Sequence, residues 1–211
     1  MKTRTLGTLA LLFLVGCSSL PKAPAPETNL NNRTTAFHNM GNKSVSQMEF
    51  QKALTFYGKA LSMHASVDDQ AGVARSFLSM GQVFLCREDA CGAERNFHSA
   101  SLAAEGAQRS DLWIRAQCGL AKAQVLRRNF EDALDILMTA QVEGLPSDQR
   151  TQAVWWHDRG VVASKLEDWA QAQSSLQKAL ALNEGINNRQ GIAGDCYSLA
   201  VVYQEQGNFR E

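Results

Sequence analysis

The side chains best able to do chemistry in this sequence are its five cysteines and four histidines. A structural zinc site usually needs two ligand pairs at short spacing, and Cys86-x4-Cys91 has no second pair to complete it. The sequence also lacks the G-x-S-x-G, H-E-x-x-H and glycine-rich phosphate-loop motifs of common nucleophile, metal and nucleotide sites. The histidines are scattered, at His38, His64, His98 and His157. We therefore expect no metal site, no catalytic residues and no cofactor.

One cysteine, Cys17, follows a segment typical of a leader. Lys2 and Arg4 precede a short apolar run, Leu9 to Val15, which is too short to span a bilayer as a permanent helix. Leu14-Val15-Gly16-Cys17 resembles the bacterial lipobox, in which the leader is removed and the cysteine becomes the lipidated N-terminus. The resemblance implies that residues 1–16 are a signal peptide and that acyl chains (palmitate) on Cys17 anchor the protein to a membrane. A plain secretory signal with a chance cysteine is the alternative.

The residues behind Cys17 bear on its location. In enteric-type bacteria an aspartate after the lipidated cysteine retains a lipoprotein at the inner membrane, so Ser18 favours the periplasmic face of the outer membrane. Residues 17–32 hold three of the four prolines and show no helical periodicity, which predicts an extended tether. The helical repeat domain is then expected over residues 33–211.

Cys86 and Cys91 could form a disulfide, because an exported protein enters an oxidising compartment. The two residues are predicted on facing ends of two helices that a short turn joins. Closing so short a loop would stabilise the fold by about 2 kcal/mol on the chain-entropy model. Two reduced thiols at the helix ends are the alternative, and the sequence does not decide between them.

A repeat positions these residues. Counting from Gly41, small or aromatic residues fall 12, 16 and 19 positions later, at Ala53, Tyr57 and Ala60. The offsets recur from Gly81, Ala121 and Gly160, at spacings of 40, 40 and 39 residues. A fixed period of this length indicates a solenoid of stacked units. Small residues let two helices approach closely and large ones fill the holes between them, so the predicted role of this set is packing.

The second unit carries the fullest pattern, with Phe77-x2-Met80-Gly81-x2-Phe84 followed by Ala93, Phe97 and Ala100. This pattern resembles the tetratricopeptide repeat (TPR), in its long-unit variety of about 40 residues. The resemblance implies an all-α fold, a right-handed α-solenoid of antiparallel helix pairs with four full units and a half unit. Pro146 is predicted to follow a helix stop, with Ser147 as the next N-cap. Periodicity places helices at 33–47, 49–65, 70–86, 89–106, 111–127, 130–143, 148–165, 168–184 and 190–206.

In TPR proteins the first helix of each unit lines the concave face. Among the basic residues placed there, Arg75, Arg115 and Lys122 would form a centre suited to a peptide with an acidic group, although three cations on a solvated face are the alternative. Some TPR proteins bind the C-terminal carboxylate of a chaperone with a particular set of residues. This sequence matches that set only at Asn42 and Arg115, so we do not expect a chaperone C-terminus as the ligand. The implied peptide-binding groove is lined by His38, Asn42, Arg75, Gln82, Arg115, Lys122, His157 and Tyr197.

Two further expectations concern aromatic residues. Trp156 and Trp169 fall on core positions of the pattern, which leaves Trp155 free of the core. Cys196-x2-Leu199-Ala200-x2-Tyr203 spells the first helix of a fifth unit, with no partner helix in the sequence. Leu199, Tyr203 and Phe209 would then be exposed. Either the sequence is a fragment of a longer protein or this half unit pairs with another molecule, and we expect self-association; a helix that caps the fourth unit is the alternative.

Charge and the implied fold limit the function. The 21 basic and 21 acidic residues cancel, which gives no reason to expect a nucleic-acid partner. The leader and the repeat together predict a membrane-anchored scaffold that binds periplasmic or envelope proteins and is not an enzyme. A pilotin-like assembly factor for a pilus or secretion pore is the first alternative, and a cell-wall hydrolase is a remote one.

Overall fold

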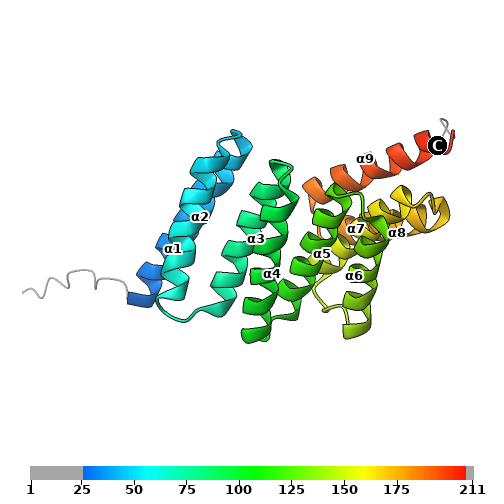
Figure 1. The fold of residues 1–211 in the computed structure, drawn as a ribbon. Coiled ribbons are helices and arrows are strands. Elements are labelled where there is room, and N and C mark those ends of the chain that lie inside the picture. Colours follow the sequence, from blue (N-terminus) through cyan, green and yellow to red (C-terminus); the bar gives the residue numbers. More distant parts are fainter. Residues whose placement is uncertain (1–25, 208–211) are drawn as a thin grey trace, which may run out of the picture.

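The computed structural model describes residues 26–207, so the predictions on the leader, Cys17 and Phe209 lie outside the described residues. Nine helices and no strand occur in that range. Each helix packs on the next in chain order, and the pairs stack side by side from α1 to α9 (Figure 1). The helices are α1 (Pro26–Ser46), α2 (Phe50–Ala65), α3 (Gln70–Cys86), α4 (Ala90–Gly106), α5 (Ser110–Leu126), α6 (Phe130–Glu143), α7 (Gln149–Lys165), α8 (Trp169–Gly185) and α9 (Arg189–Glu205). The predicted all-α solenoid of helix pairs is confirmed.

Most of the turns between helices close in the same way. In each, one residue adopts a positive φ and the next amide donates to a carbonyl five residues earlier, as in Asp69 N to His64 O at 3.0 Å. This is the hydrogen bond of a Schellman motif, which satisfies carbonyl groups left over at a helix end. Aspartates then cap several of the following helices; the Asp69 carboxylate, for example, accepts a hydrogen bond from Gly72 N at 2.8 Å. The left-handed residues are Met48, Asp68, Glu88, Gln108, Arg128, Glu167 and Asn187.

The first helix begins earlier than predicted. Residues 26–32 belong to α1, whereas the sequence placed them in the extended tether. Proline is compatible with the first turn of a helix, where its missing N–H group has no intrahelical acceptor, so Pro26 starts the helix and does not prevent it.

The predicted packing set forms the core. All eight of the repeat alanines, from Ala53 to Ala179, are fully buried. A methyl group added at Gly81 would lie 2.7 Å from the Phe97 ring, so the helices approach as closely as the glycine pattern predicted. The close approach of α3 and α4 therefore depends on Gly81.

The regular stacking is interrupted between α6 and α7. This connection runs over residues 144–148, is longer than the other turns, and contains Gly144 at φ 103°. The N-cap of α7 is Asp148 and not Ser147 as predicted; its carboxylate accepts hydrogen bonds from Thr151 N at 2.9 Å and Thr151 Oγ1 at 2.6 Å. In Figure 1, α7 and α8 are inclined relative to α3 and α4. The interruption falls where the repeat spacing shortens to 39 residues.

Two predictions about exposure were wrong. Trp155 is fully buried, because it packs in a core shared with α5 and α6, and its indole Nε1 donates to Leu137 O at 2.9 Å. Leu199 is only 8% exposed, because it packs with Val202 against Leu176 of α8. The apolar face of α9 therefore caps the fourth unit. Among the described residues no helix is both long and apolar enough to cross a membrane.

Candidate binding groove

The concave face carries three cavities, of about 950, 830 and 340 Å³. Most of their lining residues belong to the first helices of the units, α1, α3, α5, α7 and α9, and the connection before α7 adds three more. Arg115, Val154 and Gln190 line both larger cavities, and Lys122 lines all three. Because the cavities share these walls, we treat them as one groove.

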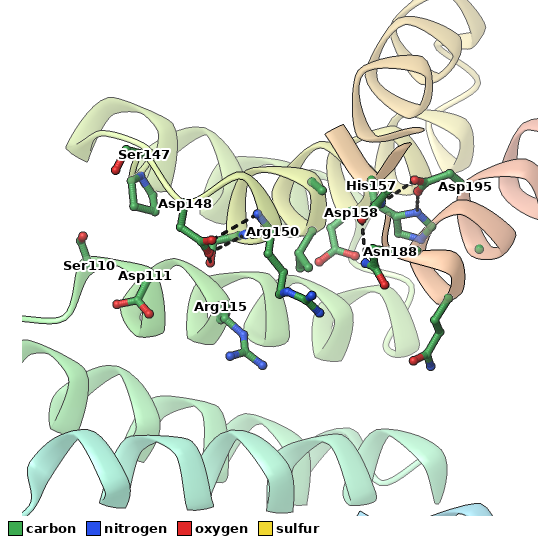
Figure 2. A pocket seen from close by; sticks show the side chains of 18 of the residues that line it. Ser110, Asp111, Arg115, Ser147, Asp148, Arg150, His157, Asp158, Asn188 and Asp195 are labelled. Carbon is green, nitrogen blue, oxygen red and sulfur yellow. Dashed lines mark hydrogen bonds and ion pairs between the residues drawn. The ribbon is translucent and has the colours of Figure 1, made fainter. Parts of the chain in front are cut away.

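The largest cavity lies beside the interrupted connection and is rich in charged groups (Figure 2). The Arg109 guanidinium makes two hydrogen bonds of 2.7 Å to the Asp111 carboxylate. Lys122 Nζ lies 3.1 Å from Asp158 Oδ2, and His157 Nδ1 lies 2.6 Å from Asp195 Oδ1. Asp158 and Asp195 are almost completely buried, so each needs its cationic or donor partner.

Two acids of the cavity, Asp111 and Asp148, have a lowered pKa and are ionised at neutral pH. The hydrogen bond from Arg109 lowers the pKa of Asp111, and the hydrogen bond from the Thr151 hydroxyl lowers the pKa of Asp148. Burial on its own would lower the pKa of Lys122, but the Asp158 carboxylate outweighs it and the pKa is raised. At neutral pH the cavity thus presents fixed charges.

Two cations of this cavity have no acid partner within the described residues. Arg115 of α5 and Arg150 of α7 form no ion pair and no side-chain hydrogen bond there. Desolvation is the main cause that lowers the pKa of Arg115; the charges of Asp111 and Asp148 oppose this shift, and the charge of Arg150 adds a little to it. The guanidinium stays charged all the same, since the pKa of arginine lies far above neutrality.

The other end of the groove is apolar. The smallest cavity is lined by the last turns of α3, α5 and α7, with Leu85, Val125 and Val161 among its residues. The cavity of 830 Å³ combines Val45 and Leu78 with the amides of Asn42 and Gln82. The groove therefore changes from charged to apolar across its width.

The structure places the predicted groove residues in two groups. Five of them line the cavities: Asn42, Gln82, Arg115, Lys122 and His157. The other three, His38, Arg75 and Tyr197, line none of the three cavities. Arg75 is drawn toward Asp69 at 3.7 Å, and Tyr197 is 72% exposed. The three cations of the predicted basic centre consequently have different surroundings: Arg75 and Lys122 form ion pairs with acids within the described residues, and Arg115 does not.

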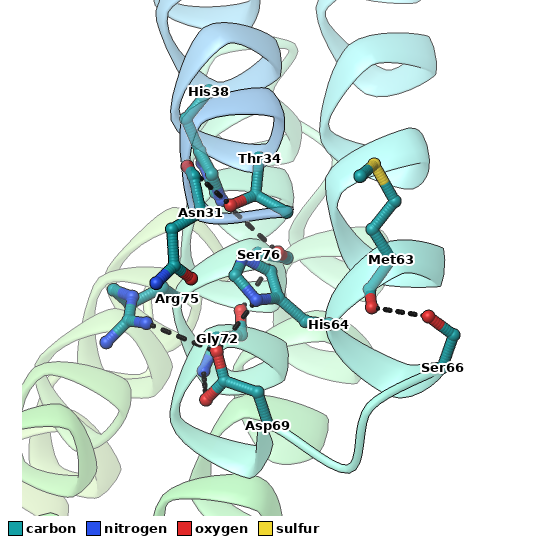
Figure 3. Close-up of polar contacts among 10 residues, drawn as sticks. All are labelled: Asn31, Thr34, His38, Met63, His64, Ser66, Asp69, Gly72, Arg75 and Ser76. Atoms are coloured by element: carbon teal, nitrogen blue, oxygen red, sulfur yellow. Dashed lines mark hydrogen bonds and ion pairs between the residues drawn. The ribbon is translucent and has the colours of Figure 1, made fainter. Parts of the chain in front are cut away.

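His38 lies in the contact between the first and second units (Figure 3). Its Nε2 is 3.3 Å from Ser76 Oγ, and its ring lies against those of Tyr57 and His64. Burial, then the charges of His64 and Arg75, lower the pKa of His38 to about 4. The residue is therefore neutral at physiological pH and contributes to packing between units.

His157 takes the same position in the fourth unit that His38 takes in the first. Each histidine contacts a side chain of the following first helix, Ser76 for His38 and Asp195 for His157. Asn183 Nδ2 donates to Asp195 Oδ2 at 2.7 Å, which completes the second cluster. The two clusters lie at opposite ends of the solenoid, and only the second one lines the groove.

Sequence reasoning missed several residues of the groove, chiefly Arg150, Gln190 and Asp195. Arg150 carries a signal that could have found it, because a cation in the first turn of a helix opposes the helix dipole. The shortened repeat spacing marked the same place. Asp195 gave no such signal, since its burial depends on the fold of α9 against α7.

Cys86 and Cys91 are free thiols in the structure, and the disulfide between them stays a prediction. Cys86 faces the groove, 3.9 Å from Gln82 Nε2, while Cys91 Sγ lies 3.3 Å from an Arg127 nitrogen at the edge of the next unit. The thiols therefore point to different sides of the turn. No group of three or more potential metal ligands gathers within residues 26–207.

Searches of protein-family models and of curated proteins found no match. Solved structures do match, among them the apo form of RapI, at 17% identity and a TM-score of 0.58 over 83% of this chain and 49% of RapI. A Rap protein complexed with Competence and Sporulation Factor matches at 18% identity and a TM-score of 0.69. The match covers 87% of this chain and 53% of the Rap protein. TPR-like repeats of a putative kinesin light chain from Podosopora anserina match at 15% identity and a TM-score of 0.57. The match covers 83% of this chain and 87% of that one.

These likenesses concern the fold. They show an α-solenoid of the kind found in TPR-like repeat proteins, as the Gly and Ala pattern predicted. The chain spans about half the length of the two Rap proteins.

Proposed function

We propose that this protein is an interaction scaffold whose concave groove binds an extended or helical segment of a partner protein. The observation that carries the proposal is the continuity of the three cavities along the first helices, from Asn42 of α1 to Gly194 of α9. A groove with charged, amide and apolar parts suits a peptide, which offers all three kinds of group. The Rap neighbour in complex with Competence and Sporulation Factor supports the same use of a similar fold.

Site-specific photo-crosslinking tests this proposal. A benzophenone amino acid at Gln82, which lines two cavities, should capture a partner in cells, and mass spectrometry would identify it. The matched control is the same group at His98, an exposed position on α4 that lines none of the cavities. Adducts that form equally from both positions, or from neither, would contradict a binding role for the groove.

The cellular location belongs to the same proposal. The lipobox-like sequence at Cys17 supports a lipid anchor that holds the solenoid on an envelope membrane, at the periplasmic face of the outer membrane. Cys17→Ser should move the protein into the soluble periplasmic fraction, and Cys196→Ser should leave its location unchanged. If the Cys17 variant stays with the membranes after a carbonate wash, the anchor is not at this residue.

The crosslinking experiment also separates the alternatives. A pilotin-like role predicts that the captured partner is a pore-forming component of a pilus or secretion system. Self-association predicts adducts with a second copy of this chain. Leu199, one of the three residues that motivated self-association, is buried against α8, which supports a partner protein as the expected product.

A further inference from the structure

We propose that Arg115 and Arg150 anchor an aspartate or glutamate side chain of the segment that binds in the groove. The inference rests on the proposed function and specifies the chemistry of the partner. It depends on how the charges of the largest cavity are paired, on the position of Arg150 in α7, and on the shape of the groove around the two arginines.

The acids of the cavity are already engaged. Asp111 is held by Arg109, Asp158 by Lys122 and Asp195 by His157, while Asp148 accepts the hydrogen bonds that cap α7. What remains is the pair Arg115 and Arg150, each with five N–H donors that no described side chain accepts. Figure 2 shows the two side chains extending from neighbouring helices into this cavity.

The position of Arg150 has no structural explanation. It is the second residue of α7, where the positive end of the helix dipole disfavours a cation. At the second residue of α5 the chain has Asp111, which suits the dipole. Arg150 also lies two residues after the interrupted connection, whose Pro146, Ser147 and Asp148 line the cavity. The second arginine of the cavity therefore lies where the chain departs from the repeat.

Local charge favours a carboxylate over a phosphate. Arg109, Asp111, Arg115, Asp148 and Arg150 lie around the same end of the cavity, and their charges sum to +1. One carboxylate neutralises that charge, whereas a phosphate group carries nearly two negative charges and would face Asp111 and Asp148. Two guanidinium groups can also bind both oxygens of a single carboxylate.

The surroundings favour an acidic side chain within the segment over a terminal carboxylate. From the arginines the groove continues both toward Gln190 and Gly194 of α9 and toward Val45 of α1. A bound segment can therefore pass the site in both directions. The apolar cavity at the ends of α3, α5 and α7 would receive a large aliphatic residue of the same segment.

Selection from random peptides tests the anchor. The purified full-length chain, in mild detergent, would be used to select phage-displayed 12-residue peptides, and the selected peptides should be enriched in Asp or Glu beside aliphatic residues. Replacing that acid by its amide should weaken binding tenfold to a hundredfold in fluorescence anisotropy, the range for one charged hydrogen-bonded group. In Arg115→Gln with Arg150→Gln, the acidic and amide peptides should bind equally. Arg95→Gln, at an exposed arginine of α4 with no ion pair in the described chain, should retain the difference.

The outcomes separate the two proposals. If peptides are selected without any preference for an acid, or if the preference survives in the double variant, the anchor is refuted while the groove keeps its binding role. If binding is lost only when the peptide's C-terminus is amidated, the site takes a terminal carboxylate and the inference is wrong. If the unmodified chain selects no peptide at all, the proposed function fails and the anchor with it.

Discussion

Replacement by alanine should change the stability of the protein in opposite directions at two glycines within helices, Gly81 and Gly58. Gly81 lies within α3 and Gly58 within α2, so each loses about 1 kcal/mol of helix propensity relative to alanine. A methyl group on Gly58 would meet no atom within 4 Å, whereas one on Gly81 would lie 2.7 Å from Phe97 Cε1. The two substitutions thus differ only in what the new methyl group contacts.

The Phe97 ring cannot move away from Gly81 easily, because Gly119 of α5 lies in equally close contact with it. Overpacking of this kind typically costs 1–3 kcal/mol, and we take the upper half of that range for a ring enclosed on two sides. After the gain in helix propensity, Gly81→Ala should lower the free energy of unfolding by about 1–2 kcal/mol. Gly58→Ala should raise it by about 0.5–1 kcal/mol.

Urea denaturation followed by circular dichroism at 222 nm measures both changes. The double variant Gly81→Ala with Phe97→Leu provides the control, because the smaller side chain leaves room for the methyl group and the two effects should not add. If Gly81→Ala stabilises the protein as Gly58→Ala does, the close helix approach inferred from the glycine pattern is refuted.

Three other outcomes are expected. Lys122→Met should lower the free energy of unfolding by about 3 kcal/mol, because it leaves Asp158 buried without its partner. In urea titrations, the double variant Lys122→Met with Asp158→Leu should recover most of this loss. Equal losses for the single and the double variant would contradict the prediction. The pKa of His38 is about 4 when folded and 6.5 otherwise, so the unfolded chain binds more protons between these values and stability should fall as the pH is lowered from 7 to 5. Solvent screening limits the full effect to on the order of 1–2 kcal/mol, and His38→Gln should show a flatter profile than the unmodified chain. Burial, and then Asp158, raises the pKa of Cys118, so native alkylation followed by mass spectrometry should label the three exposed cysteines of the described chain and spare this one.

The helix pairs could be predicted from the sequence because their cause is local. Gly81 and Phe97, or Gly41 and Tyr57, are separated by one helix and one short turn, so the spacing along the chain is the spacing across one helix pair. Every helix boundary but the first lies within two residues of its prediction. At α1 the prolines of the tether were weighed as helix breakers, although a proline can also begin a helix.

The groove could be predicted only in outline. Periodicity assigned residues such as Gln82 and Lys122 to the concave side, and both line cavities. The same reasoning placed His38 and Arg75 there, but periodicity gives the face of a helix and not the direction of a long side chain at the edge of that face. Asp69, which pairs with Arg75, is the N-cap of the same helix, and Ser76, which contacts His38, lies in the first helix of the next unit.

The sequence by itself therefore determined the repeat, the helix pairs and the small residues at which they touch, since each depends on contacts within one unit. Only the tertiary structure decided which charges meet, as Lys122 meets Asp158 and His157 meets Asp195 from successive units. It also decided that Trp155 is buried and that Arg115 and Arg150 share a cavity. These features depend on the angle between neighbouring units, which changes at the interrupted connection before α7. That angle is set by packing between units, so the sequence pattern of one unit does not predict it.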